Sequence, residues 1–176
     1  MKHTISVLVE NHAGVLSKVS GLFARRAFNI DSLAVGVTED PAVSRMTIVV
    51  NGDDYTVEQV EKQLNKLIDV IKVKVLSSGE FISEELILIK VNAPAQSRSE
   101  IMQIADIFGA KIIDVSRSML TLEFAGDSAR IHTLEDMLTP YGIREEVRTG
   151  TIAIESGTGL IRSADNRAAQ AHSIDN

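Results

Sequence analysis

The feature that most constrains the fold is an order of strands and helices that the sequence predicts twice. Apolar residues that alternate with polar ones predict strands, and apolar residues spaced three or four apart predict helices. In the first half this gives strand, helix, strand, strand, helix and strand, at residues 5–9, 15–23, 33–37, 46–50, 56–68 and 71–75. Such an order is typical of the ferredoxin-like split arrangement, in which both helices cover one face of an antiparallel sheet. The other face then needs a second layer or polar side chains.

The same order recurs after the Ser77-Ser78-Gly79 break. Strands are expected at 86–91, 112–115 and 119–124, helices at 97–108 and 127–140, and a weakly patterned extended segment at 143–154. The sequence therefore predicts an α+β protein with two ferredoxin-like βαββαβ domains. The expected boundaries are a first domain at 1–77, a linker at 78–83, a second domain at 84–156 and a polar, mobile tail at 157–176.

Capping residues predict where three of the helices begin. Thr56 with Gln59, and Ser97 with Glu100, match the capping box, in which two side chains satisfy free N–H groups at a helix start. Asp127 is a suitable N-cap for the last helix. We therefore expect these helices to start at those positions.

Charge and composition limit the classes of function. The formal net charge of the 176 residues is −6 and the pI is about 5.2, with Lys and Arg spread along the chain. Nucleic acid is therefore not an expected partner, because phosphate binding needs clustered basic residues. Glu10 ends the apolar run Ile5–Val9 far short of a signal or membrane-spanning segment, so a cytoplasmic location without membrane contact is expected. The chain has no cysteine, which excludes disulfides and thiolate metal sites.

The size of each half favours association. A domain of roughly 80 residues buries only about 60% of its unfolded surface, so each half has a thin core. We therefore expect the domains or the subunits to pair.

The candidate ligand site is the turn that leads from the first strand into the first helix. A helix start leaves its first N–H groups without partners and carries partial positive charge, so it attracts anions. Gly14 allows a ligand to approach the main chain, and Asn11 can offer its amide to a small carboxylate or phosphate. The alternative is that Asn11 and Gly14 only steer the turn, and that Asn29 is a left-handed C-cap at the other end of the helix.

Long stretches of the chain resemble a known family. The first half carries ISVLVENHAGVLSKVSGLFARRAFNIDSLAVGVTED, SRMTIVV and VEKQLNKLIDVIKV, and the second half carries EIMQIADIFGAKIIDV and LTPYGIREEVRTG. These segments resemble the small regulatory subunits of acetolactate synthase, also called acetohydroxyacid synthase. The resemblance is ungapped over residues 4–76 and covers nearly the whole chain except the tail.

The resemblance implies an amino-acid-binding ACT domain at the N-terminus and an ACT-like C-terminal domain. It also implies that two N-terminal domains form a homodimer with one continuous sheet and hold the feedback inhibitor, usually valine, in the seam. The implied ligand-binding residues are Asn11, Ala13, Gly14, Val15 and Leu16 of one subunit, with Asn29 and Ile30 of the facing subunit. Valine, isoleucine and leucine cannot be ranked from this loop, since one methylene contributes only about 0.8 kcal/mol.

The implied function is that of a regulatory subunit. Such a subunit activates a separate large catalytic subunit and confers feedback inhibition by valine in the biosynthesis of valine, isoleucine and leucine. Because the chain is too short for a thiamine-diphosphate enzyme, catalysis must belong to the large subunit. Thiamine diphosphate, Mg²⁺ and FAD are implied on that catalytic subunit only, and no cofactor is implied on this chain.

The residues themselves suggest no catalytic or metal site. Four histidines are scattered without the spacing of metal ligands, at His3, His12, His132 and His172. The pairs Asp53-Asp54 and Glu84-Glu85 are expected at element boundaries, where helix-start electrostatics and solvation explain them. The sequence has no nucleophile elbow and no phosphate-cradling glycine motif.

Three alternative classes share parts of this pattern. An RNA-recognition module has the same element order, but it stacks bases on aromatic residues, and the expected third strand SRMTIVV has none. An enzyme of acylphosphatase type also combines this order with an anion-binding loop. A stand-alone amino-acid sensor without a catalytic partner stays open as well.

Overall fold

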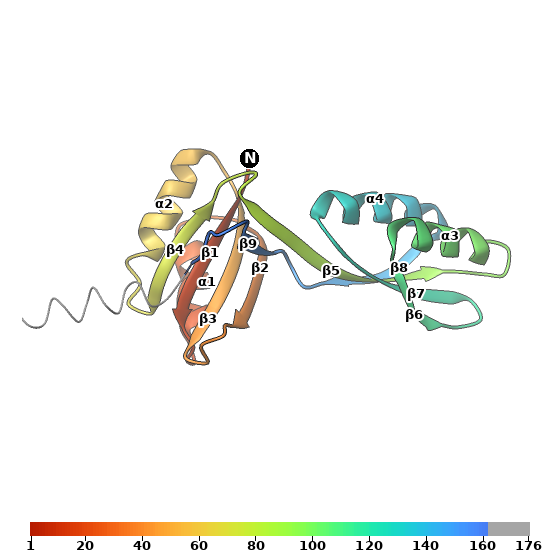
Figure 1. Cartoon of the computed structure of the whole chain (residues 1–176), viewed down its shortest axis with the longest axis horizontal. Coiled ribbons are helices and arrows are strands. Elements are labelled where there is room, and N and C mark those ends of the chain that lie inside the picture. Colours follow the sequence, from red (N-terminus) through yellow and green to blue (C-terminus); the bar gives the residue numbers. More distant parts are fainter. Residues whose placement is uncertain (162–176) are drawn as a thin grey trace, which may run out of the picture. The chain divides into compact units, whose positions relative to one another are not determined.

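The computed structural model describes residues 1–161, so most of the expected tail lies outside the described residues. The chain divides into two compact units (Figure 1). Among the described residues, the first unit contains Met1–Ile82 and 151–161, and the second unit contains Ser83–Gly150. Each unit is described by itself below.

The first unit has the predicted order of elements. These are β1 (Lys2–Glu10), α1 (Val15–Arg25), β2 (Ile30–Val37), β3 (Val43–Asn51), α2 (Asp54–Leu64) and β4 (Val70–Leu76). The strands form an antiparallel sheet in the order β2-β3-β1-β4, which confirms the ferredoxin-like arrangement.

Alternation along the strands builds the core of the first unit on one face of this sheet. The central pair β1 and β3 aligns Ile5 with Ile48 and Val7 with Met46, and all four side chains are buried. Both helices contribute to the same core, with Val15, Val19, Leu22 and Phe23 from α1 and Val57, Val60 and Leu64 from α2. The two helices therefore cover the same face of the sheet.

The second unit repeats this topology. Its elements are the greater part of β5 (Phe81–Asn92), α3 (Arg98–Phe108), β6 (Lys111–Val115), β7 (Met119–Gly126), α4 (Ser128–Leu138), the 3₁₀ turn η1 (Thr139–Tyr141) and β8 (Ile143–Arg148). The strand order β6-β7-β5-β8 matches that of the first unit position by position. The prediction of two ferredoxin-like domains is therefore confirmed.

The expected helix starts are right for α4 and wrong for α2. Asp127 caps α4 and accepts a hydrogen bond from the Arg130 N–H at 2.8 Å. The N-cap of α2 is Asp53, which accepts both the N–H and the hydroxyl of Thr56, so Thr56 lies inside the first turn. The same helix ends at Leu64, earlier than predicted, and Ile68 is 91% exposed.

The capping box predicted for α3 does not form. Ser97 is the N-cap, as expected, but its side chain makes no capping hydrogen bond. Glu100 accepts a hydrogen bond from the Tyr141 hydroxyl at 2.9 Å. The carboxylate is therefore engaged with η1, which explains why it does not reach back to the helix start.

A short strap, residues 151–156, covers the face of the first sheet that has no helices. It contains β9 (Ile152–Glu155), which pairs with β5 and is labelled in Figure 1. Polar contacts also hold the strap to strands of the first sheet. The Thr151 N–H donates to Ser32 Oγ at 2.8 Å, Arg45 Nη2 donates to the Ala153 carbonyl at 3.0 Å, and Lys74 pairs with Glu155. Arg45 and Lys74 lie next to core residues of β3 and β4, so strand alternation places their side chains on the opposite face.

The compact units of the structure and the domains predicted from sequence divide the chain at different residues. Residues 151–156 belong to the first compact unit, although the sequence pattern assigns them to the second domain. The expected linker at 78–83 also differs, because β5 begins at Phe81 and crosses from one unit into the other. The reason is physical: the bare sheet face needs a cover, and the chain supplies one from a distant segment.

We expect the strap to depend on the small side chain of Ala153, which is buried, whereas neighbouring Ile154 is exposed. In the variant Ala153→Gln, the larger side chain does not fit, and backbone amides of residues 151–156 should exchange with solvent at least about tenfold faster. The matched control Ile154→Gln should leave this rate nearly unchanged. Equal exchange in both variants, measured by mass spectrometry, would contradict a strap packed through Ala153.

Candidate functional site

Gly14 is the N-cap of α1, and its backbone explains why glycine stands there. Its φ is 89° and its ψ is −11°, a left-handed conformation that L side chains rarely adopt. A Cβ placed on Gly14 would meet no atom within 4 Å, so the space beside it is open. Gly14 therefore allows the sharp turn from β1 into α1, and it also leaves room for a ligand.

The first turn of α1 offers main-chain donors. The Lys18 N–H bonds to the Gly14 carbonyl at 3.0 Å, and no side chain among the described residues caps the helix. The N–H groups that precede Lys18 in this turn have no carbonyl one turn earlier in the helix. With the partial positive charge of the helix start, they form a place that favours an anion.

The residues around Gly14 contribute in different ways. The Val15 side chain is buried in the core, so only its main chain faces the turn. Leu16 is 45% exposed, and Ala13 is exposed with its carbonyl accepting from His12 Nδ1 at 3.1 Å. The site therefore combines main-chain polar groups with one available apolar side chain.

Asn11 supports the loop from within the protein. Its Nδ2 donates to the Pro41 carbonyl at 2.8 Å, and its Oδ1 accepts from Ser44 Oγ at 3.0 Å. Its own N–H bonds to the Ala42 carbonyl at 2.8 Å. These bonds fasten the loop to the start of β3, and the second N–H of the exposed amide stays available to a ligand.

Asn29 and Ile30 lie far from Gly14 in the same chain. The 11 residues of α1 stand between the two places, a length of about 16 Å at about 1.5 Å per residue. The strand register also separates the two groups, since Ile30 pairs with Val50 at one end of β3 and Glu10 pairs with Val43 at the other end. Asn29 is exposed and donates to Asp31 at 3.0 Å, and Ile30 is half-buried. One chain therefore does not bring the two groups together.

A charged cluster supports the loop at residues 11–14, and sequence reasoning missed the central residue of this cluster. Asp69 precedes β4, and its side chain is only 8% exposed. It accepts from Lys18 Nζ at 2.6 Å and from His12 Nε2 at 3.0 Å, and its carbonyl accepts from the Glu10 N–H at 2.9 Å. No local motif marks Asp69, because the cluster forms only when β4 pairs with β1.

The contacts explain two pKa shifts. The hydrogen bond from Lys18 is the main reason that the pKa of Asp69 lies below its usual value. The bond of His12 to the Ala13 carbonyl, with the nearby charge of Asp69, raises the pKa of His12, although desolvation opposes the change. The electrostatics therefore favour an ionised carboxylate and a protonated imidazole in the loop.

The fold also brings together groups that the histidine spacing does not suggest. One ligand atom each of Glu10, His12 and Asp69 lies within 4.8 Å of the other two. However, the second oxygen of Asp69 is bound by the Lys18 ammonium, a cation that already balances the carboxylate. We therefore assign this cluster to the support of the loop.

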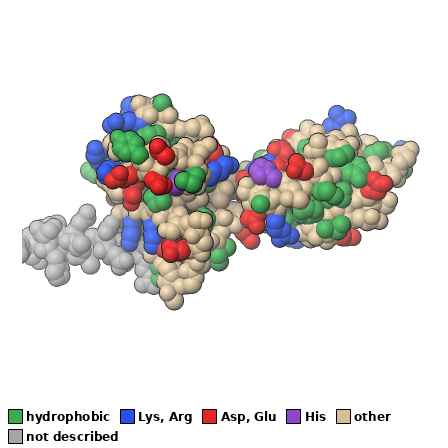
Figure 2. Space-filling model, turned by 90° about the horizontal axis from the view of Figure 1, so that it is seen from above, with side chains coloured by type: hydrophobic (Ala, Val, Ile, Leu, Met, Phe, Trp, Pro, Cys, Tyr) green, Lys and Arg blue, Asp and Glu red, His purple; other side chains and the backbone are tan. Residues whose placement is uncertain are grey.

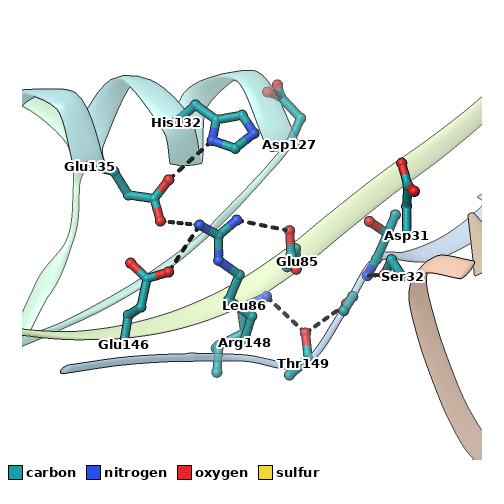
Figure 3. A network of polar contacts seen from close by, with 12 residues as sticks. Asp31, Ser32, Glu85, Leu86, Asp127, His132, Glu135, Glu146, Arg148 and Thr149 are labelled. Atoms are coloured by element: carbon teal, nitrogen blue, oxygen red, sulfur yellow. Dashed lines mark hydrogen bonds and ion pairs between the residues drawn. The ribbon is translucent and has the colours of Figure 1, made fainter. Parts of the chain in front are cut away.

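The interpretation of Glu84-Glu85 as a solvated boundary pair is wrong for Glu85. Glu85 is buried within β5, 4.0 Å from Arg148, which also pairs with Glu135 and Glu146 (Figure 3). Burial alone lowers the pKa of Arg148, but Glu135 and the other carboxylates outweigh it and raise the pKa. His132 bonds to Glu135 at 3.1 Å, so these groups form a structural network of the second unit.

The surface carries mixed charges and some exposed apolar side chains. On the face drawn in Figure 2, basic side chains are interspersed with acidic ones, as the sequence led us to expect. Apolar side chains of the second unit also remain exposed, among them Met102 and Ile107 of α3 and Met137 of α4. Within the described part of the chain, no helix is long and apolar enough to cross a membrane.

Comparisons with known proteins give the family. Residues 5–72 match the family model of the AHAS small subunit-like ACT domain, and residues 84–157 match that of the small subunit of acetolactate synthase. A probable acetolactate synthase small subunit of Archaeoglobus fulgidus is 53% identical over 157 residues, 89% of this chain and 98% of its own length. The acetolactate synthase small subunit of Mycolicibacterium smegmatis is 50% identical over 162 residues, 92% of this chain and 95% of its own.

A solved structure supports the same assignment. The crystal structure of the acetolactate synthase small subunit from Thermotoga maritima superposes with a TM-score of 0.84 at 40% sequence identity. The match covers 90% of this chain and 99% of that chain. Sequence and fold therefore agree on one family.

We expect Gly14 and Gly21 to respond oppositely to alanine. Gly14→Ala should lower the free energy of unfolding by about 1–2 kcal/mol, because its left-handed φ strains a residue with a Cβ. Gly21 lies inside α1, where a Cβ meets only Arg25 Nη1 at 3.4 Å, so Gly21→Ala should leave stability unchanged or raise it by up to about 1 kcal/mol. Urea denaturation measures both, and a loss at Gly21 as large as at Gly14 would contradict this account of the turn.

Proposed function

The chain belongs to the family of acetolactate synthase small subunits, and from this premise we propose its specific role. It activates a separate catalytic subunit and confers feedback inhibition by valine in the biosynthesis of branched-chain amino acids. Residues 1–77 act as the effector-binding ACT domain. Residues 84–156 form the C-terminal ACT-like domain, whose last residues, the strap at 151–156, pack on the first compact unit. The chain has no catalytic role of its own, and thiamine diphosphate, Mg²⁺ and FAD belong to the catalytic subunit.

The observation that carries the proposal is the open, uncapped start of α1 at Gly14. The N–H groups there bind the carboxylate of valine, and the exposed Leu16 side chain contacts its isopropyl group. Each hydrogen bond to an ionised group contributes about 1.5–3 kcal/mol, and burial of the isopropyl group about 1.5–3 kcal/mol. Two such bonds and the apolar contact suffice for a micromolar to millimolar effector, about 4–8 kcal/mol.

A second copy of the chain completes this site. β2 is an edge strand of the first sheet, with Val35 and Val37 exposed. Antiparallel pairing of two β2 strands brings the Ile30 end of one copy beside the Val37 end of the other. Val37 pairs with Ser44, which in turn holds Asn11, so this arrangement brings Asn29 and Ile30 of the partner towards the Gly14 loop.

A site shared between two subunits also explains how valine acts at a distance. An effector shifts an equilibrium only if it binds one arrangement of the subunits better than another. Valine that contacts both copies favours the arrangement in which Asn29 and Ile30 of one copy lie next to the Gly14 loop of the other. In the proposed mechanism this arrangement activates the catalytic subunit less well.

Reconstitution tests the regulatory role. Acetolactate formation by the matching large subunit is measured with and without this chain, over a range of valine concentrations. We expect the chain to stimulate the rate and valine to reverse the stimulation. Valine binding without stimulation would leave a stand-alone amino-acid sensor, and neither binding nor stimulation would reject both roles.

The variant Asn29→His tests the contribution of the second subunit. The imidazole is larger than the carboxamide and presents its donor and acceptor at different positions, so valine affinity should fall at least about tenfold. Asn65→His is the control, because Asn65 is an exposed asparagine at the end of α2. It should retain both valine binding, measured by calorimetry, and feedback inhibition. Undiminished valine binding by Asn29→His would reject the assigned site.

A further inference from the structure

Both ring nitrogens of His12 face groups that can only accept hydrogen bonds. Its Nδ1 is 3.1 Å from the Ala13 carbonyl, and its Nε2 is 3.0 Å from Asp69 Oδ1 and 3.4 Å from Glu10 Oε2. A neutral imidazole carries a proton on only one ring nitrogen. Both contacts are therefore hydrogen bonds only when the ring is the doubly protonated imidazolium.

We propose that His12 is a positioning residue whose proton fastens the effector loop, so that the binding of the amino acid and the binding of a proton are linked. This inference rests on the effector site at Gly14 proposed above. Protonated His12 ties the Ala13 carbonyl to the carboxylate of Asp69. Ala13 precedes Gly14, so the proton holds the peptide that leads into the site.

The proton on His12 determines the net charge of the cluster around it. Glu10 comes from β1, Lys18 from α1 and Asp69 from the segment that precedes β4. Lys18 Nζ binds Asp69 Oδ2, so Asp69 remains an acceptor for His12 Nε2. With His12 protonated, two positive and two negative charges balance. With His12 neutral, one negative charge is in excess beside the place proposed for the effector's carboxylate.

Loss of the proton from His12 weakens effector binding in two ways. Loss of the proton breaks one of the two bonds of the ring, and it leaves a net negative cluster that repels the carboxylate. The pKa of His12 is raised, so the imidazolium persists to a higher pH than in an unperturbed histidine and is lost as the pH rises through the raised value. Effector affinity should therefore be highest at low pH and fall across that titration.

The experiment is calorimetry of valine binding to the full chain between about pH 6 and about pH 8.5, where histidines titrate. We expect the dissociation constant of the unaltered chain to rise by about three- to tenfold over this range, as one hydrogen bond is lost. Repetition in two buffers of different ionisation enthalpy should show proton uptake on binding. In His12→Gln, which cannot titrate, most of the rise and of the proton uptake should disappear.

His3→Gln is the matched control, since His3 lies in the same unit near Gly52 and away from the Gly14 loop. It should keep the pH dependence of the unaltered chain.

Nuclear magnetic resonance of the unaltered protein adds a test without substitution: saturation with valine should raise the pKa of His12 further.

The outcomes separate this inference from the proposed function. Valine binding with the same pH dependence in His12→Gln, or a pKa of His12 that valine leaves unchanged, would overturn the linkage and leave the effector site intact. No valine binding at any pH would overturn the effector site and the linkage together.

Discussion

The structure of the candidate site depends on the left-handed turn at Gly14. A residue with φ of 89° carries the chain from β1 into α1 and leaves the helix start without a side-chain cap. The main-chain N–H groups there have no partner within the helix, and the space beside the glycine is open. An ordinary Ser or Asp cap would have filled this place with its own oxygen. The site therefore exists because the loop has no capping side chain and no Cβ at Gly14, and it suits a small anion.

A loop that offers its main chain must be held by its neighbours. Asn11 fastens one side to the start of β3, and Asp69 fastens the other through Lys18 and His12. These supports come from β3, from α1 and from the segment before β4, so the ferredoxin-like topology itself brings them together. The fold keeps the loop in place while the helix start stays accessible.

The sequence predicted those features that depend on local pattern. The two βαββαβ repeats, the start of α1 and the Asp127 cap follow from periodicity and turn chemistry, which neighbouring residues determine. It did not predict features that depend on tertiary pairing. Asp69 reaches the loop only through the pairing of β1 with β4. Glu85 is buried 4.0 Å from Arg148 of β8, and the strap packs on a sheet face that no helix covers. Family resemblance, and not local pattern, supplied the expectation that Asn29 acts on a neighbouring subunit's site.

The central claim is that main-chain amides at the start of α1 grasp the carboxylate of an amino-acid effector. Nuclear magnetic resonance of the full chain tests it most directly, through the backbone amide shifts of residues 13–17 during a titration with valine. The account predicts that these amides move together along one saturation curve, and that the amides of residues 29 and 30 follow the same curve. Saturable valine binding that leaves the amides of 13–17 unmoved would contradict it.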